Sequence, residues 1–214
     1  MDAYDTEKEQ IEKIKKWWDA NGTAIIVGLV VGIGGIFGFR YWESSKMLAG
    51  ESASANYEHL LTVSRAGASD EATAAADALI NHQADTPYAK MAALLSAKLA
   101  VDDNDYASAK QRLTWVANQP DAGKLNTIAK VRLAQVLLAE GNAEEAWNQF
   151  SSLDATTKAL FPEQHGDILL AQGKLDDANA QYQIALEKAA EFGIDTEPVQ
   201  LKLDNMSFLQ AQTQ

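Results

Sequence analysis

Cysteine is absent from this sequence of 214 residues, and proline and histidine are scarce, with four and three residues. A chain without cysteine forms no disulfide, supplies no thiolate nucleophile and holds no zinc through sulfur. The histidines lie far apart, at positions 59, 82 and 165, so the common catalytic and metal-binding sets of side chains are poorly supplied. We therefore expect a protein that is not an enzyme and that needs no metal or cofactor.

Positive charge is also in deficit. Lys and Arg number 18 against 30 for Asp and Glu, which gives a formal net charge of −12. Proteins that bind nucleic acid or anionic lipid headgroups gather cations on one face to neutralise phosphates. The balance argues against a nucleic-acid partner. Hydrophobic residues make up 47% of the chain, a share typical of a folded protein.

One long run without charge stands near the N-terminus, between Asp19 and Arg40. A helix rises about 1.5 Å per residue, so this run spans roughly 30 Å, the thickness of the hydrocarbon core of a bilayer. Tryptophans precede the run and Tyr41 and Trp42 follow it, as aromatic residues do at membrane interfaces. We predict a transmembrane helix over residues 20–40. A cleaved signal peptide is the alternative, which the long tail of mixed charge before the run disfavours.

The lysines around this run predict its orientation. Four lysines lie between residues 8 and 16, whereas only Arg40 and Lys46 follow closely after the run. Because the more cationic flank stays in the cytoplasm, we predict a cytoplasmic tail over residues 1–19 and a translocated domain from residue 41 onward. In a bacterium that domain lies in the periplasm, with the span in the inner membrane.

The tail and the span each carry a pattern with two readings. In the tail, Ile11, Ile14 and Trp18 form an apolar stripe, which fits a helix on the membrane surface or a docking site for a cytoplasmic partner. In the span, small residues four apart let another helix approach closely, although glycine is common in such helices anyway. The glycines in question are Gly28, Gly32, Gly34 and Gly38.

Past the span, three segments repeat one spacing. In each segment a small residue is followed seven positions later by Asn or Gly. An Ala stands five positions after that turn residue, and a bulky residue stands four positions after the Ala. Antiparallel helices cross closely only where both side chains are small, and a tight turn favours Gly or Asn. The offsets between segments bracket the roughly 34 residues of a tetratricopeptide hairpin. The three sets are Ala97, Asn104, Ala109 and Leu113; Ala134, Gly141, Ala146 and Phe150; and Gly166, Gly173, Ala178 and Tyr182.

These repeats predict an all-α protein, with one N-terminal transmembrane helix followed by a tetratricopeptide-like helical-hairpin solenoid over residues 41–209. A generic helical bundle is the alternative. A less regular helical pair is expected over residues 43–65 and 70–83. A closing helix should begin at Thr196-Glu197-Pro198, with Pro in its first turn, and end near Leu209. The polar residues 210–214 are expected to fray.

The first helix of each hairpin in such a solenoid lines a concave face that binds partners. Counting from the small residue of each unit predicts an apolar groove with an acidic mouth, suited to unfolded segments or to a partner helix. The alternative is that these residues form the core or are covered by the closing helix. The candidates are Met91, Leu94, Lys98, Val101, Ile128, Val131, Gln135, Leu138, Leu160, Glu163, Asp167 and Leu170.

Two polar clusters do not match the pattern of a metal-binding site. Residues 163–167 group two carboxylates with a histidine but lack the spacing of a zinc site, and we interpret them as a polar turn of a helix. Asp102, Asp103 and Asp105 resemble part of a calcium loop without its glycine and terminal glutamate. They fit a helix end and the N-cap of the next helix better.

The charged tail with WW, the Gly-rich span ending FRYWESS, and LKLDNMS near the C-terminus resemble the YfgM family of ancillary subunits of the bacterial SecYEG translocon. The resemblance covers nearly the whole chain. It implies association with SecYEG and with the membrane-anchored periplasmic chaperone PpiD, transfer of emerging polypeptides to periplasmic chaperones, and no catalytic residues. A tethered scaffold for another envelope assembly is the alternative function.

Overall fold

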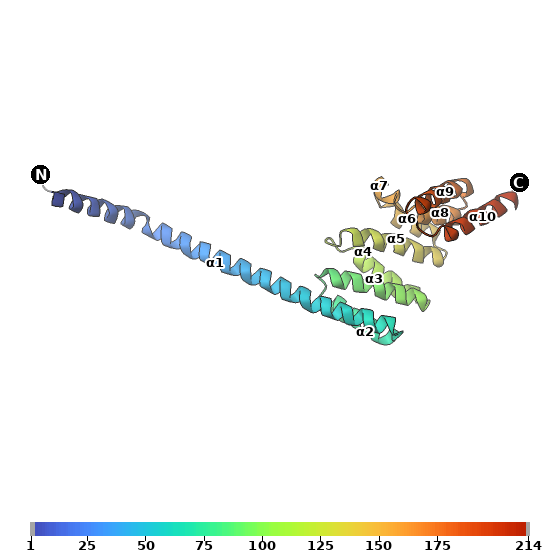
Figure 1. Ribbon diagram of the computed structural model, residues 1–214, viewed down its shortest axis with the longest axis horizontal. Helices are drawn as coiled ribbons and strands as arrows, with labels where there is room; N and C mark the ends of the chain where they lie inside the picture. The colour runs from blue at the N-terminus through green and yellow to red at the C-terminus, as the bar shows by residue number, and fades with distance from the viewer. Residues whose placement is uncertain (1–2, 213–214) are drawn as a thin grey trace. The chain divides into compact units, whose positions relative to one another are not determined.

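The computed structural model describes residues 3–212 (Figure 1). Ten α-helices and no β-strand lie within these residues, which confirms the all-α class. The chain divides into two compact units, Met1–Ser52 and Ala53–Gln214. Helix α1 (Ala3–Arg65) contributes to both units, and each unit is described by itself.

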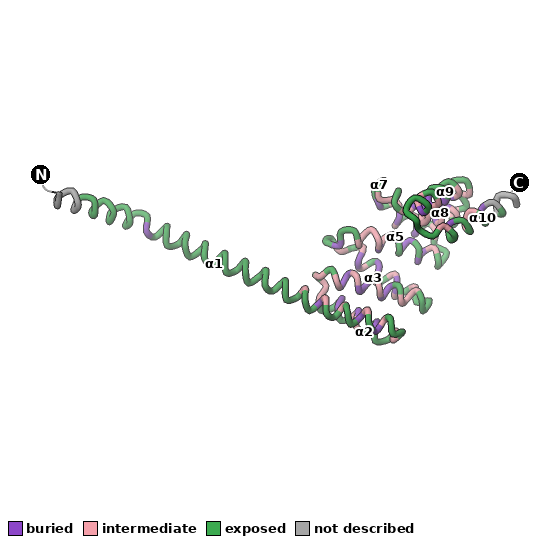
Figure 2. The backbone as a smooth tube through the Cα atoms, in the orientation of Figure 1, coloured by how far each residue is buried: buried purple, intermediate pink, exposed green. Residues whose placement is uncertain are grey.

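The first unit is the N-terminal part of α1. Every residue from Glu9 to Ala49 except Gly22 is exposed, large apolar side chains included (Figure 2). Among the described residues, this helix alone is long and apolar enough to cross a membrane, with an 18-residue window of mean hydropathy 2.2. Soluble proteins rarely leave so much apolar surface uncovered. Along the predicted span, lipid would cover this apolar surface.

The span glycines lie on open helix surface. A Cβ atom added at Gly28, Gly32, Gly34 or Gly38 would meet nothing within 4 Å. A helix turns about 100° per residue, so Gly34 points about 200° away from Gly32. The two glycine pairs therefore occupy different faces, and one partner helix cannot use both.

The second unit is a series of helical hairpins. The end of α1 shares one buried cluster with α2 (Figure 1). Helix α3 pairs with α4, α5 with α6, and α8 with α9, while α10 packs against α9. The less regular first pair and the closing helix were both expected from the sequence. The helices are α2 (Ser69–His82), α3 (Pro87–Asp102), α4 (Tyr106–Ala117), α5 (Lys124–Ala139), α6 (Ala143–Ser151), α7 (Ala155–Lys158), α8 (Pro162–Ala171), α9 (Leu175–Glu191) and α10 (Glu197–Gln212).

Two boundaries differ from the expected ones. Helix α1 continues without a break past the predicted end of the span, and the compact unit begins at Ala53 rather than at residue 41. Helix α10 continues to Gln212, so residues 210–212 are helical where fraying was expected, and residues 213–214 lie outside the described residues. In α10 the buried Val199 and Met206 explain the helix, because they pack into the core of the last hairpin.

The turn residues of the repeat adopt the backbone conformation that their identity predicts. Asn104, Gly141 and Gly173 have φ values of 63°, 82° and 75°. In each turn the amide of the following residue donates to the carbonyl five residues back, at 2.7 to 2.9 Å, which is the Schellman arrangement that ends a helix. Gly67 makes the same turn in the first hairpin, with φ 75°.

Each hairpin has one small and one bulky residue that lie sixteen positions apart in the sequence. One of the two stands in each helix of the hairpin. In the first hairpin the order is reversed, because the bulky residue lies in the first helix. That reversal hid the first hairpin from the sequence pattern. The four pairs, all buried, are Leu60 and Ala76, Ala97 and Leu113, Ala134 and Phe150, and Gly166 and Tyr182.

The last pair combines the smallest residue with the bulkiest. Replacing Gly166 by alanine puts a Cβ atom 2.7 Å from the Tyr182 ring. We expect the free energy of unfolding to fall by about 1–3 kcal/mol, the usual cost of overpacking a core. Combining it with Tyr182→Leu should remove the conflict, because alanine and leucine already form the pair at Ala97 and Leu113.

Chemical denaturation of the full-length protein in a non-ionic detergent measures this coupling for the two single variants and the double variant. A cost of Gly166→Ala that is equal with and without Tyr182→Leu would contradict the steric explanation.

Candidate partner-binding groove

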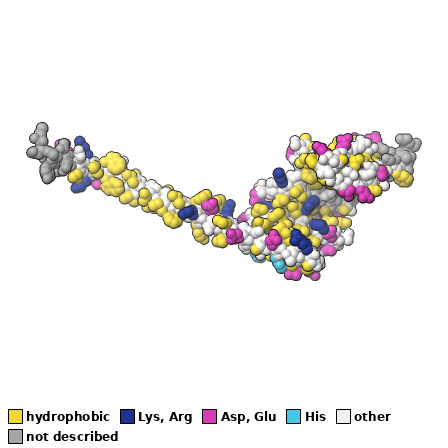
Figure 3. Space-filling model, in the orientation of Figure 1, with side chains coloured by type: hydrophobic (Ala, Val, Ile, Leu, Met, Phe, Trp, Pro, Cys, Tyr) yellow, Lys and Arg dark blue, Asp and Glu magenta, His cyan; other side chains and the backbone are white. Residues whose placement is uncertain are grey.

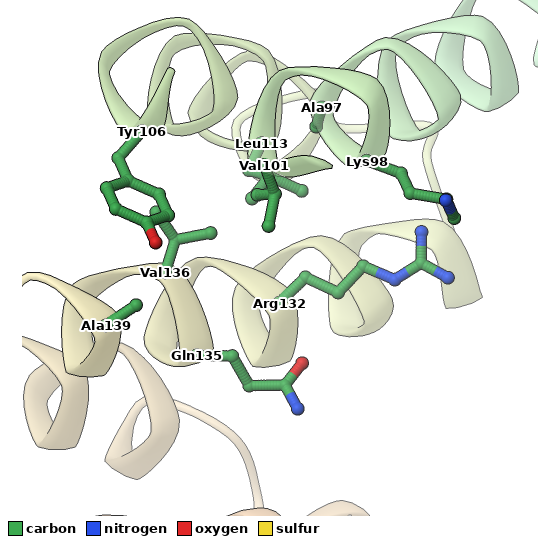
Figure 4. A pocket seen from close by; sticks show the side chains of 9 residues that line it. All are labelled: Ala97, Lys98, Val101, Tyr106, Leu113, Arg132, Gln135, Val136 and Ala139. Carbon is green, nitrogen blue, oxygen red and sulfur yellow. The ribbon is translucent and has the colours of Figure 1, made fainter. Parts of the chain in front are cut away.

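A pocket of about 380 Å³ opens between α3 and α5 (Figure 4). Its floor is mainly apolar, and Tyr106 points from the start of α4 toward α5. Two cationic side chains and one amide stand at its edge. The lining residues are Ala97, Lys98, Val101, Tyr106, Leu113, Arg132, Gln135, Val136 and Ala139.

The edge of this pocket is cationic. Lys98 pairs with Asp102 at 2.5 Å, but both side chains are more than half exposed, so the pair is weak. Arg132 is exposed and has no ion pair among the described residues. Figure 3 shows Lys and Arg side chains beside an apolar area on the visible face of the hairpin unit. The two acidic residues of the predicted groove, Glu163 and Asp167, do not line this pocket.

A second pocket, of about 410 Å³, adjoins the first along α5. Gln135 and Ala139 line both pockets. The other lining residues, Leu138 from α5 and Asp167, Leu170 and Ala171 from α8, extend the surface to the next hairpin. We call the two pockets together the α3–α5–α8 groove.

Six of the twelve predicted residues line this groove, and six do not. Leu94 and Val131 line neither pocket and belong to the buried core, which is the alternative that the sequence left open for them. Met91 and Ile128 are half-buried and line neither pocket. Leu160 and Glu163 line a different pocket, formed with α9 and α10. The residues that line the groove are Lys98, Val101, Gln135, Leu138, Asp167 and Leu170.

The sequence prediction missed Arg132, Ala139 and Tyr106. On α5 the exposed residues that line the pocket are Arg132, Gln135 and Ala139. Arg132 and Ala139 each lie one position after a predicted residue. The predicted residues and the pocket-lining residues of α5 both recur every three or four positions, as residues on one helix face do. Only the polarity of Arg132 could have shown which set faces the solvent. Tyr106 escaped because it begins the second helix of its hairpin, and the prediction used first helices alone.

At α8 the predicted stripe is partly covered by the chain itself. Lys202 of α10 places its Nζ 2.7 Å from Asp167 Oδ1 and 2.8 Å from Glu163 Oε1, and the Tyr182 hydroxyl donates to Asp167 Oδ1 at 2.8 Å. Burial lowers the pKa of Lys202, but the two carboxylates outweigh it and hold this pKa above its ordinary value. Burial and the Asp167 carboxylate raise the pKa of Tyr182. A side chain of the closing helix therefore occupies part of the predicted stripe at Glu163 and Asp167.

The polar cluster at residues 163–167 does not form one site. It lies inside α8, as a polar turn of that helix. Glu163 and Asp167 share one face, since they are four residues apart, whereas His165 points elsewhere. Its ring centroid lies 5.7 Å from that of Trp147 and 5.2 Å from that of Phe150.

The aspartates near position 104 have the predicted structural role. Asp102 is the last residue of α3. Asp105 caps α4, because its Oδ1 accepts a hydrogen bond from the Ser108 amide at 3.1 Å. The carboxylates therefore serve a helix end and an N-cap.

Known proteins match the chain over nearly its full length. The model of a tetratricopeptide repeat-like domain family matches residues 15–208. An ancillary SecYEG translocon subunit of Aggregatibacter actinomycetemcomitans is 32% identical over 95% of this chain and 100% of its own length. The chain belongs to the ancillary SecYEG translocon subunit family. Relatives with the same name from Haemophilus influenzae and Escherichia coli are 29% and 26% identical, over 95% and 97% of this chain and 100% of their own. No solved structure matches the chain.

Membership of this family confirms the resemblance to the YfgM family and the tetratricopeptide-like fold. The matched region begins before the predicted span and ends within α10. The family relationship therefore covers the apolar helix as well as the hairpins.

His165 makes the stability of the hairpin unit sensitive to acid. Burial, together with the charges of Lys158 and Lys174, holds the pKa of His165 below its ordinary value, although Gln181 and Asp177 act in the opposite direction. As the pH falls below about 6.5, the unfolded chain therefore binds the proton before the folded one does. Stability should fall in that range.

We expect the melting temperature of the full-length protein in a non-ionic detergent to drop between pH 7.5 and 5.5. The drop should be smaller in His165→Phe, which keeps an aromatic ring against Trp147 and cannot titrate. His82→Phe, at an exposed position, is the matched control and should behave as the unmodified protein does. Equal drops in all three proteins would refute a role for His165.

Proposed function

We propose that this protein is a membrane-tethered, non-catalytic adaptor of the SecYEG translocon. The observation that carries this proposal is the full-length similarity to proteins all named ancillary SecYEG translocon subunit. Because the similarity includes the apolar helix, it supports membrane tethering together with the hairpin domain. The chain then acts by binding other polypeptides.

In this proposal α1 crosses the inner membrane once, with the N-terminal tail in the cytoplasm and the hairpin unit in the periplasm. The lysines between residues 8 and 16 support this orientation, since cationic flanks remain inside. The hairpin unit would then meet polypeptides as they leave the translocon.

The α3–α5–α8 groove is the surface that we assign to these emerging polypeptides. Its floor offers apolar contacts from Val101, Leu113 and Val136, and its edge offers hydrogen bonds from Arg132 and Gln135. An unfolded segment loses conformational entropy when it binds, so a small open groove holds it weakly. Weak, reversible binding suits transfer of the segment to a chaperone, and we propose PpiD as the chaperone partner.

The span supplies the contacts within the membrane. Without a hydrophobic drive between helices, close packing at small residues holds them together in lipid. Gly28 and Gly32 present one such face, and Gly34 and Gly38 present another. We propose that one face packs against SecYEG and the other against the membrane anchor of PpiD.

Purification of the full-length protein in a mild detergent tests the partners. We expect SecYEG and PpiD to be recovered with it. The double substitutions Gly28→Ile with Gly32→Ile, and Gly34→Ile with Gly38→Ile, should each reduce recovery of one partner severalfold, because the added side chains keep the helices apart. Leu29→Ile conserves volume and is the control. Recovery of neither partner with the unmodified protein would overturn the translocon assignment.

Photocrosslinking tests the groove and the orientation together. A photoreactive amino acid is placed at Gln135, which is exposed and lines both pockets, in cells where a secretory protein is arrested halfway through SecYEG. The matched control is Gln111, exposed on α4 and outside both pockets. We expect the arrested chain to crosslink at Gln135 severalfold more than at Gln111. Equal crosslinking, or none at Gln135, would count against the groove.

A further inference from the structure

The part of α1 that precedes the predicted span carries an apolar stripe without a partner. Four large apolar side chains lie there, at least half of each is exposed, and none belongs to a hydrophobic cluster of the described residues. A helix turns about 100° per residue, so all four fall within about 75° of one direction. We call them the tail stripe. They are Ile11, Ile14, Trp17 and Trp18.

The charged side chains of residues 9–19 are sorted around the tail stripe. One lysine borders it on each side, at about 90° and 115° from its centre, whereas the three carboxylates lie farther round, at about 125–155°. A bordering lysine can lay its methylene chain on lipid while its ammonium reaches the headgroup phosphates, and the carboxylates stay away from those phosphates. The bordering lysines are Lys13 and Lys15, the carboxylates are Glu9, Glu12 and Asp19, and Lys16 lies opposite the stripe.

The distance to the predicted span also favours lipid as the cover of the tail stripe. Ile14 and Ile11 precede residue 20 by six and nine positions, which is about 9 and 14 Å along a helix. The headgroup layer on each side of the hydrocarbon core is only about 5–8 Å thick. A tail that continued straight out of the membrane would therefore hold both isoleucines in water. A tail that turned into the membrane plane would bring all four side chains to the interface, where tryptophan is enriched.

The junction between the tail and the span favours a bend. Asn21 Nδ2 donates a hydrogen bond to the Trp17 carbonyl at 2.9 Å, which in a regular helix accepts from the Asn21 amide alone. Gly22 comes next, and a Cβ atom there would lie 3.0 Å from the Trp18 ring. Glycine, and a side chain bound into the backbone ladder, are common causes of a helix kink. Helix α1 can therefore turn at residues 21–22 without ending.

We propose that residues 9–19 form an amphipathic helix that lies in the cytoplasmic interface of the membrane, with the tail stripe in the lipid. The stripe then binds a lipid surface rather than a cytoplasmic protein. Residues 9–19 carry three lysines and three carboxylates, so the apolar side chains supply the binding and anionic lipid is not required. The inference rests on the proposed function in one respect, because it requires α1 to span the membrane.

Spin labels test the proposal on the full-length protein in nanodiscs of uncharged phosphatidylcholine. The chain has no cysteine, so Ile11→Cys or Ile14→Cys directs a label to one site in the tail stripe. Lys16→Cys, on the opposite face and nearer to the span, is the matched control. Accessibility to oxygen, which concentrates in lipid, should exceed accessibility to a water-soluble nickel complex severalfold at positions 11 and 14. The opposite should hold at position 16.

A tail that projects straight from the membrane gives the reverse order of depth, because residue 16 then lies nearer to the lipid than residues 11 and 14. That order would overturn the proposal.

A label in the span separates this inference from the proposed function. Val30→Cys places it near the middle of the predicted span. Lipid exposure at position 30 together with water exposure at positions 11 and 14 would overturn the interfacial tail and leave the membrane-tethered adaptor intact. Water exposure at position 30 would overturn both.

Substitutions in the stripe test which side chains hold the tail. Trp17→Ser with Trp18→Ser should move the label at position 14 from oxygen to nickel accessibility, because two interfacial anchors are lost. Trp42→Ser, at the other end of the span, is the matched control and should leave this label unchanged. A label that the double substitution does not move would contradict the proposal. Spin–spin broadening at position 14 that unlabelled protein dilutes away would make a second copy the occupant, and would also overturn it.

Discussion

Close crossing of paired helices is the constraint on which the hairpin unit depends. Two helices joined by a turn of three residues have little freedom to separate, so a bulky side chain at the crossing must face a small one. Each hairpin meets this requirement with one small and one bulky residue sixteen positions apart, from Leu60 and Ala76 to Gly166 and Tyr182. Each hairpin thus combines one small and one bulky side chain at its crossing, and either helix can carry the bulky one.

This constraint explains which parts of the fold could be predicted from the sequence. Turn residues were found because a positive φ restricts Asn104, Gly141 and Gly173 to a few residue types. The first hairpin was recognised only as an irregular pair, since Leu60 stands where the other hairpins have a small residue. The closing helix continues three residues past its expected end near Leu209, because glutamine does not by itself stop a helix.

The candidate site was less predictable than the fold. Helical periodicity reports that one side of α5 faces the core, but it does not fix the rotation of the helix to within one residue. Val131 therefore entered the prediction in place of its neighbour Arg132. Lys202 lies 35 residues from Asp167 in the sequence, and no local pattern connects such a pair. The net charge also concealed the local arrangement, because a chain of charge −12 still presents a cationic edge at its groove.

The last hairpin shows how the crossing constraint reaches the binding surface. Only glycine at position 166 leaves room for the Tyr182 ring, and a buried tyrosine needs a partner for its hydroxyl. Asp167 is that partner, and its negative charge in turn holds Lys202 of α10 at 2.7 Å. The Gly and Tyr pair in the core is thus linked through Asp167 to Lys202 of the closing helix, which packs against α9. The pocket at α3 and α5 has no such link, because Ala97 and Leu113 make the crossing there without any polar side-chain atom.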